Sequence, residues 1–150
     1  MGQMGQAMDV TELKRQHDEI SLVAKQLNEA VGDENAPHHV ARLRWQLARL
    51  LITHLALEDR LLYPAAMRSS HDEARKTAMT MQQEMGDLAA RFSSYMTAWS
   101  DDRILREWPA FCAQTRALLA TLGDRIESEN RILYPLVVRA AASAPQRKAS

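Results

Sequence analysis

Residues 54–64 read HLALEDRLLYP, and residues 125–135 read RIESENRILYP. Glu, Arg, Leu, Tyr and Pro coincide between the two stretches, and the same offset carried backwards pairs Leu51 with Leu122. The chain therefore contains an internal repeat. We expect the two stretches to lie on equivalent helices, each belonging to one of two helix pairs.

Around the repeat, apolar residues recur with the 3.6-residue period of an α-helix. Motifs of the form Asp-x-x-Glu at Asp9 and Ser-x-x-Glu at Ser70 read as capping boxes that open helices. The proline of each Tyr-Pro pair removes an interior hydrogen bond, which predicts a helix bend there. Four helices are expected, at about 9–31, at 37–68, from 70 to the polar turn SDD at 100–102, and at 108–142, with a short helical piece before the last.

Each predicted helix has one stripe of residues that should face inward. The stripes are Leu13, His17, Ile20, Ala24, Leu27 and Val31; Val40, Leu43, Leu47, Leu51, His54, Glu58 and Leu61; and Ala74, Ala78, Met81, Met85, Leu88, Phe92 and Tyr95. The sequence thus predicts an all-α, up-down-up-down four-helix bundle over residues 9–142, with flexible ends at 1–8 and 143–150.

Composition excludes several classes of function. Lys plus Arg equals Asp plus Glu at 19 each, so the composition predicts no basic surface that would favour the binding of nucleic acid. The first ten residues lack the basic start and the apolar core of a signal peptide, and no apolar run approaches the length of about 20 residues that would span a membrane, so we expect neither feature. Cys112 is the single cysteine, which excludes an internal disulfide and favours a reducing cytoplasm. The neutral surface leaves monomer and homodimer open.

Four polar residues interrupt the apolar stripes. His54 and Glu58 are four residues apart and so share one helix face, while His17 and Glu129 interrupt the first and fourth helices. A buried carboxylate is costly unless it is paired or bound to a cation. Imidazole and carboxylate groups that project inward from facing helices are how bundles build metal sites.

Together, His17, the His54-x-x-x-Glu58 pair, the Leu-Tyr-Pro that follows and its return after Glu129 resemble the hemerythrin HHE cation-binding family, over about residues 10–140. The resemblance implies a di-iron centre between four helices. It also implies that each helix pair supplies one His from its first member and a His-x-x-x-Glu from its second.

This sequence departs from the family pattern at two positions. Arg125 stands where the second His-x-x-x-Glu would have its His, and Met85 occupies the His position of the third helix. The matching ligands are therefore His17, His54, Glu58 and Glu129. Glu84 lies at nearly the right height and is a further candidate ligand. His71 is excluded, because it would lie about 15 Å from the site along the helix axis.

Arg125 stays charged and can bind a carboxylate with two hydrogen bonds, so it can supply the charge of a missing metal. We therefore predict a mononuclear site for iron, with Zn or Mn as alternatives and with two ions not excluded. The resemblance implies a role in oxygen, nitric oxide or iron handling or sensing, with a diatomic or peroxide ligand.

Two other hypotheses remain open. In the first, the bundle is a metal-free interaction or signalling module in which Arg125 binds both carboxylates in a buried polar network. In the second, the protein is an iron-dependent oxidase or peroxidase, although the sequence offers no nucleophile or acid–base pair beyond the site already named.

Overall fold

The computed structural model describes residues 9–32 and 37–142, and all regular structure there is helical. The predictions for 1–8, for 33–36 of the first linker and for 143–150 lie outside these residues. The elements are α2 (Val10–Ala30), α3 (Pro37–Leu57), η1 (Glu58–Leu62), α4 (Tyr63–Met67), α5 (Asp72–Met85), α6 (Leu88–Ala98), α7 (Asp101–Arg106), α8 (Trp108–Ser128), η2 (Glu129–Leu133) and α9 (Tyr134–Ala142).

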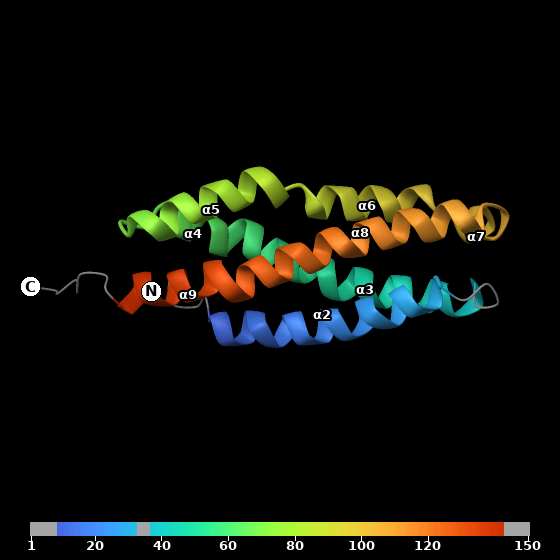
Figure 1. Ribbon diagram of the computed structural model, residues 1–150, viewed down its shortest axis with the longest axis horizontal. Helices are drawn as coiled ribbons and strands as arrows, with labels where there is room; N and C mark the ends of the chain where they lie inside the picture. The colour runs from blue at the N-terminus through green and yellow to red at the C-terminus, as the bar shows by residue number, and fades with distance from the viewer. Residues whose placement is uncertain (1–8, 33–36, 143–150) are drawn as a thin grey trace, which may run out of the picture.

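These elements form four long rods that lie side by side, as Figure 1 shows. The first rod is α2, the second runs from α3 through η1 to α4, the third is α5 with α6, and the fourth runs from α8 through η2 to α9. Contacts join α2 to α3 and α8, α3 to α6, and α5 to α9, which closes the bundle. The predicted all-α four-helix architecture is confirmed.

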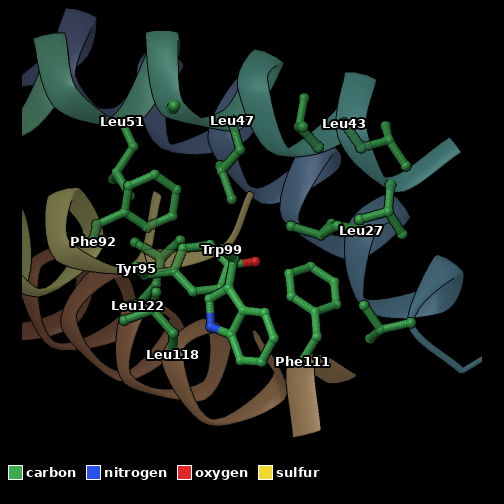
Figure 2. Packing of buried hydrophobic residues seen from close by; sticks show 14 of the residues in the cluster. Leu27, Leu43, Leu47, Leu51, Phe92, Tyr95, Trp99, Phe111, Leu118 and Leu122 are labelled. Carbon is green, nitrogen blue, oxygen red and sulfur yellow. The ribbon is translucent and has the colours of Figure 1, made fainter. Parts of the chain in front are cut away.

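The bundle has two apolar clusters, one toward each end. The larger cluster joins α2, α3, α6 and α8 and contains Leu47, Phe92 and Phe111 (Figure 2). The smaller cluster joins α2, η1, α4, α5, η2 and α9 and contains Leu13, Leu62 and Leu133. Between the two clusters the first, second and fourth rods carry buried polar side chains instead. No helix among the described residues is long and apolar enough to cross a membrane.

Each Tyr-Pro pair follows a π-helical turn. The turns η1 and η2 occupy equivalent positions of the repeat, directly before Tyr63 and Tyr134. A π-turn widens the helix locally, which suits a following proline that cannot donate a backbone hydrogen bond. The predicted distortion is therefore a change of helix type at each repeat.

One residue that was predicted to face inward, Leu61, faces the solvent instead. Leu61 was placed on the inner stripe, but it is 45% exposed, whereas Leu62 is only 1% exposed. An α-helical stripe steps by three or four residues, and after Glu58 the structure takes the step of four; the wider π-turn also brings Tyr63, five residues after Glu58 and 2% exposed, to the inner face. The inward series therefore continues from Glu58 to Leu62.

Alanine substitutions test this register. Leu62→Ala should lower the free energy of unfolding by about 2 kcal/mol or more, because it leaves a cavity in the smaller cluster. Leu61→Ala, its neighbour on the solvent side, should change that energy by less than about 0.5 kcal/mol. Urea unfolding measures the free energy of unfolding of both variants. Equal losses would contradict the inward position of Leu62 and the outward position of Leu61.

The third helix is also different from the prediction. It was expected to run unbroken through Met85, but α5 ends there and α6 begins at Leu88. The helix starts at Asp72 with His71 as its N-cap, where Nδ1 of His71 accepts the backbone N–H of Ala74 at 3.2 Å, so Ser70 is not the cap. The break after Met85 leaves the carbonyl of Met85 free for a side-chain donor.

Candidate metal centre

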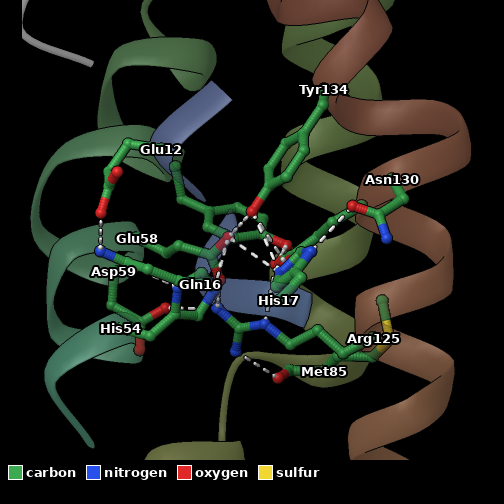
Figure 3. A network of polar contacts seen from close by, with 12 residues as sticks. Glu12, Gln16, His17, His54, Glu58, Asp59, Met85, Arg125, Asn130 and Tyr134 are labelled. Atoms are coloured by element: carbon green, nitrogen blue, oxygen red, sulfur yellow. Dashed lines mark hydrogen bonds and ion pairs between the residues drawn. The ribbon is translucent and has the colours of Figure 1, made fainter. Parts of the chain in front are cut away.

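His17, His54, Glu58 and Glu129 come together between the two apolar clusters, as Figure 3 shows for the first three. Each offers one ligand atom, and these atoms lie within 4.8 Å of one another. No side chain of the four is more than 2% exposed. The positions follow from the helical pattern, because each residue takes the place of an apolar residue on its inner stripe.

Both histidines present Nε2 to the cluster and bind an amide through Nδ1. His17 Nδ1 lies 2.8 Å from Asn130 Oδ1, and His54 Nδ1 lies 2.7 Å from Gln16 Oε1. Since an amide oxygen only accepts, each Nδ1 carries a proton. This arrangement, in which the outer ring nitrogen donates to a neighbouring oxygen, is the usual one for metal-binding histidines.

The Nε2 atom of His54 is buried and makes no hydrogen bond. It lies 3.3 Å from Oε2 of Glu58, at ion-pair distance, but without hydrogen-bonding geometry. A neutral imidazole with its proton on Nδ1 has a bare lone pair at Nε2 and cannot donate there. The atom is therefore an unsatisfied acceptor that faces two carboxylates.

Two tyrosines from the repeat bind the carboxylates crosswise. Tyr63 on the second rod donates to Oε2 of Glu129 at 2.8 Å, and Tyr134 on the fourth rod donates to Oε2 of Glu58. The Tyr134 hydroxyl also lies 3.2 Å from Nε2 of His17, and the two rings stack with their centroids 5.2 Å apart. These contacts hold both carboxylates at the bundle axis.

Arg125 occupies the remaining side of the site and binds four acceptors. Its Nε donates to Oε2 of Glu129 at 2.9 Å, and its Nη2 donates to Oε1 of Glu58 at 3.1 Å. Nη2 also donates to Oδ1 of Asp59 at 2.9 Å, while Nη1 donates to the backbone oxygen of Met85 at 3.1 Å. The guanidinium is therefore a buried cation between two buried carboxylates.

The repeat explains why Arg125 has these partners. Asp59 and Asn130 each follow the repeated Glu directly, and Asn130 binds the imidazole of His17. Asp59, the counterpart of Asn130, accepts from Arg125 instead, and Arg125 also donates to the carbonyl of Met85, the residue at the position equivalent to His17. Arg125 thus stands at one missing histidine of the family pattern and bonds to the residue at the other.

Burial and charge shift the pKa values of these groups in different directions. Burial, together with the neighbouring His17, lowers the pKa of His54 to about 4, so this imidazole is neutral at neutral pH. Burial also opposes the charged form of His17, but its hydrogen bonds to Glu129 and Asn130 outweigh burial and raise its pKa. Burial raises the pKa of the Glu129 carboxyl.

Glu84, the further candidate ligand, is not brought to the cluster. Its side chain is exposed, because the inner face of α5 consists of Ala74, Ala78 and Met81 and the helix ends one residue after Glu84. The third carboxylate beside Arg125 is Asp59 instead. Met85 is partly buried and contributes its backbone oxygen rather than its side chain.

Sequence reasoning also missed the groups that surround the ligands. They are Gln16, Asn130, Asp59, Tyr63 and Tyr134. The first three have a common signal, because each is the direct neighbour of a predicted site residue. The tyrosines were visible as part of the repeat, but their crosswise contacts depend on how the second and fourth rods pack.

The donor set fits a transition-metal ion. Two imidazole nitrogens and two carboxylates are ligands that iron, zinc and manganese accept, and the partnerless Nε2 of His54 is an atom that an ion would satisfy. Both histidines already have their outer nitrogens bound. Arg125 takes up one oxygen of each Glu, and so it reduces the negative charge that is left for a cation.

Comparison with known proteins agrees with this geometry. No curated protein and no solved structure gives a match to the chain. The family model described as the hemerythrin HHE cation-binding domain matches residues 8–137, which is most of the sequence. The chain therefore belongs to the hemerythrin HHE cation-binding domain family.

Proposed function

We propose that the protein binds one divalent metal ion, iron in the first place, through His17, His54, Glu58 and Glu129, and that Arg125 replaces the second ion of a dinuclear centre. The proposal rests on two groups that the structure places at the bundle axis. One is the bare Nε2 of His54, and the other is the guanidinium that joins Glu58 to Glu129.

A bound iron would supply a Lewis-acidic and redox-active centre for a small molecule. The four ligand side chains are almost fully buried, so a molecule that reaches them without a large opening of the bundle must be of the size of oxygen, nitric oxide or peroxide. This supports a role in handling or sensing such molecules or iron itself. Rapid consumption of peroxide or oxygen would favour an oxidase or peroxidase.

A metal-free bundle that serves as an interaction module is the second candidate. It is favoured by the completeness of the Arg125 network, since the guanidinium binds both Glu58 and Glu129 and also Asp59 without any ion. A satisfied polar network of this kind can fix helix register. Under this reading, His17 and His54 contribute packing alone.

Metal content separates the two candidates. Protein purified without an affinity tag and reconstituted anaerobically with iron should contain about one iron per chain, and Arg125→His should raise this toward about two, because it restores a ligand of the dinuclear family pattern. Arg131→His is the matched control, since Arg131 is exposed on the same rod. It should leave the content unchanged.

The other results are equally informative. About two ions in the unsubstituted protein would show that Arg125 does not replace a metal. No iron after reconstitution would overturn metal binding and leave the interaction module as the better account.

A further inference from the structure

We infer that Gln16 is a positioning residue that fixes the tautomer of His54, so that Nε2 faces the cluster as a bare lone pair. The inference rests on the proposed metal site for its consequence, but the tautomer is a property of the metal-free protein. It begins from the contact of 2.7 Å between Nδ1 of His54 and Oε1 of Gln16.

Gln16 can do this because its own amide group is held in one orientation. Its Nε2 donates to Oε2 of Glu12 at 3.3 Å, and Glu12 in turn accepts from Nε of Arg15 at 2.9 Å. A carboxylate accepts and cannot donate, so the amino end of Gln16 turns toward Glu12 and the carbonyl end toward His54. An exposed ion pair thereby orients a buried imidazole.

Each residue that orients a ligand lies next to another ligand in the sequence. Gln16 directly precedes His17 on α2, so His17 projects to the bundle axis while Gln16 projects toward α3 and reaches His54 (Figure 3). Asn130 does the same on the fourth rod, where it directly follows Glu129 and binds His17. In both cases the neighbour of one ligand orients a ligand on another helix.

Replacement of Gln16 should change the tautomer of His54. With leucine at position 16, a proton on Nδ1 of His54 would have no acceptor in a buried site, which is unfavourable. If the proton moves to Nε2, it finds Oε2 of Glu58 only 3.3 Å away. The imidazole, no longer held at Nδ1, is therefore expected to change to the Nε2–H form and to reorient so that it donates to Glu58. That form has no lone pair to offer to a metal at Nε2.

The tautomer of His54 is measured by long-range ¹H–¹⁵N NMR of the metal-free protein. Variants in which one histidine at a time is replaced assign the signals of His54. The unsubstituted protein should show the Nδ1–H tautomer of His54, and Gln16→Leu should show a mixture or the Nε2–H tautomer. Affinity for Zn²⁺, measured by competition with a chelator, should fall about 10- to 100-fold in Gln16→Leu.

Two further variants complete the test. Gln26→Leu makes the same change at an exposed position of α2 and should alter neither the tautomer nor the affinity. Gln16→Glu keeps an acceptor oxygen and should retain the Nδ1–H form. An unchanged tautomer in folded Gln16→Leu, or a changed tautomer with undiminished affinity, would overturn the inference. If the unsubstituted protein bound no Zn²⁺ or iron, the proposed function would fail, and the tautomer would still decide the role of Gln16.

Discussion

Replacement of Arg125 by methionine is expected to lower the free energy of unfolding of the metal-free protein by about 3–5 kcal/mol, the range for breaking a buried ion pair by removing one partner. The guanidinium is 2% exposed and is the cation that Glu58 and Glu129 share. Methionine fills much of the same volume. The loss would therefore report the uncompensated carboxylates and the carbonyl of Met85, which would lose its donor.

The control is Arg131→Met on the same rod. Arg131 pairs with Glu127 across the helix surface at 3.1 Å, and both side chains are mostly exposed. Exposed pairs of this kind contribute about 0.2–1 kcal/mol at most, so this variant should be nearly as stable as the parent. Urea unfolding of both variants, after treatment with a chelator, measures the difference.

A loss below about 1 kcal/mol for Arg125→Met would contradict this role. It would mean that the carboxylates take up a proton when the guanidinium is removed, as like charges at close range favour. Arg125 would then be one of several ways to neutralise the site rather than the cation on which it depends.

The fold was predictable because it rests on periodicity and on the repeat. Residues such as Leu47 and Leu122 recur at helical spacing, and the two Leu-Tyr-Pro stretches mark equivalent helices. The π-turns were not predictable in this way, because a turn of five residues leaves no mark on a pattern that is read at 3.6. Leu61 was misplaced for a simpler reason: Leu61 and Leu62 both lie one α-helical step from Glu58, and the pattern alone does not choose between them.

The break in the third helix was missed for a related reason. Met85 and Leu88 are three residues apart, so the apolar stripe continues across Gly86 as if the helix were unbroken. Glycine gave a local signal, since it lowers helix stability, but a single glycine in a helix is often tolerated. Glu84 was a candidate because of its height along the bundle, but height does not determine the direction of a side chain around the helix, and this side chain is exposed.

The centre of the site was predictable, and its surroundings were not. A histidine or glutamate on an apolar stripe is conspicuous, which is how His17, His54, Glu58 and Glu129 were found. Gln16 lies on the flank of its helix, where a polar residue is ordinary. Its role depends on the distance to His54 on another rod, which only the packing of α2 against α3 determines.

Metal binding should itself stabilise the fold, with the second large effect expected for this protein. A ligand that binds only the folded state at a free concentration about 1,000 times its dissociation constant adds about 4 kcal/mol to the free energy of unfolding. Because the four proposed ligands come from three rods, with only His54 and Glu58 on the same one, they come together only in the folded bundle. Excess Fe(II) under anaerobic conditions should produce this shift, and a chelator should reverse it.

Each substitution also changes packing, so the free energy of unfolding is compared with and without metal for each variant separately. The shift is the difference between these two values. In His54→Ala the shift should fall to less than about 1 kcal/mol, because the remaining ligands bind much more weakly at the same free metal. His39→Ala, at an exposed position of α3, should keep the full shift. A shift that His54→Ala retains would place the ion elsewhere on the protein. No shift in the parent would mean that Arg125 alone balances the buried carboxylates.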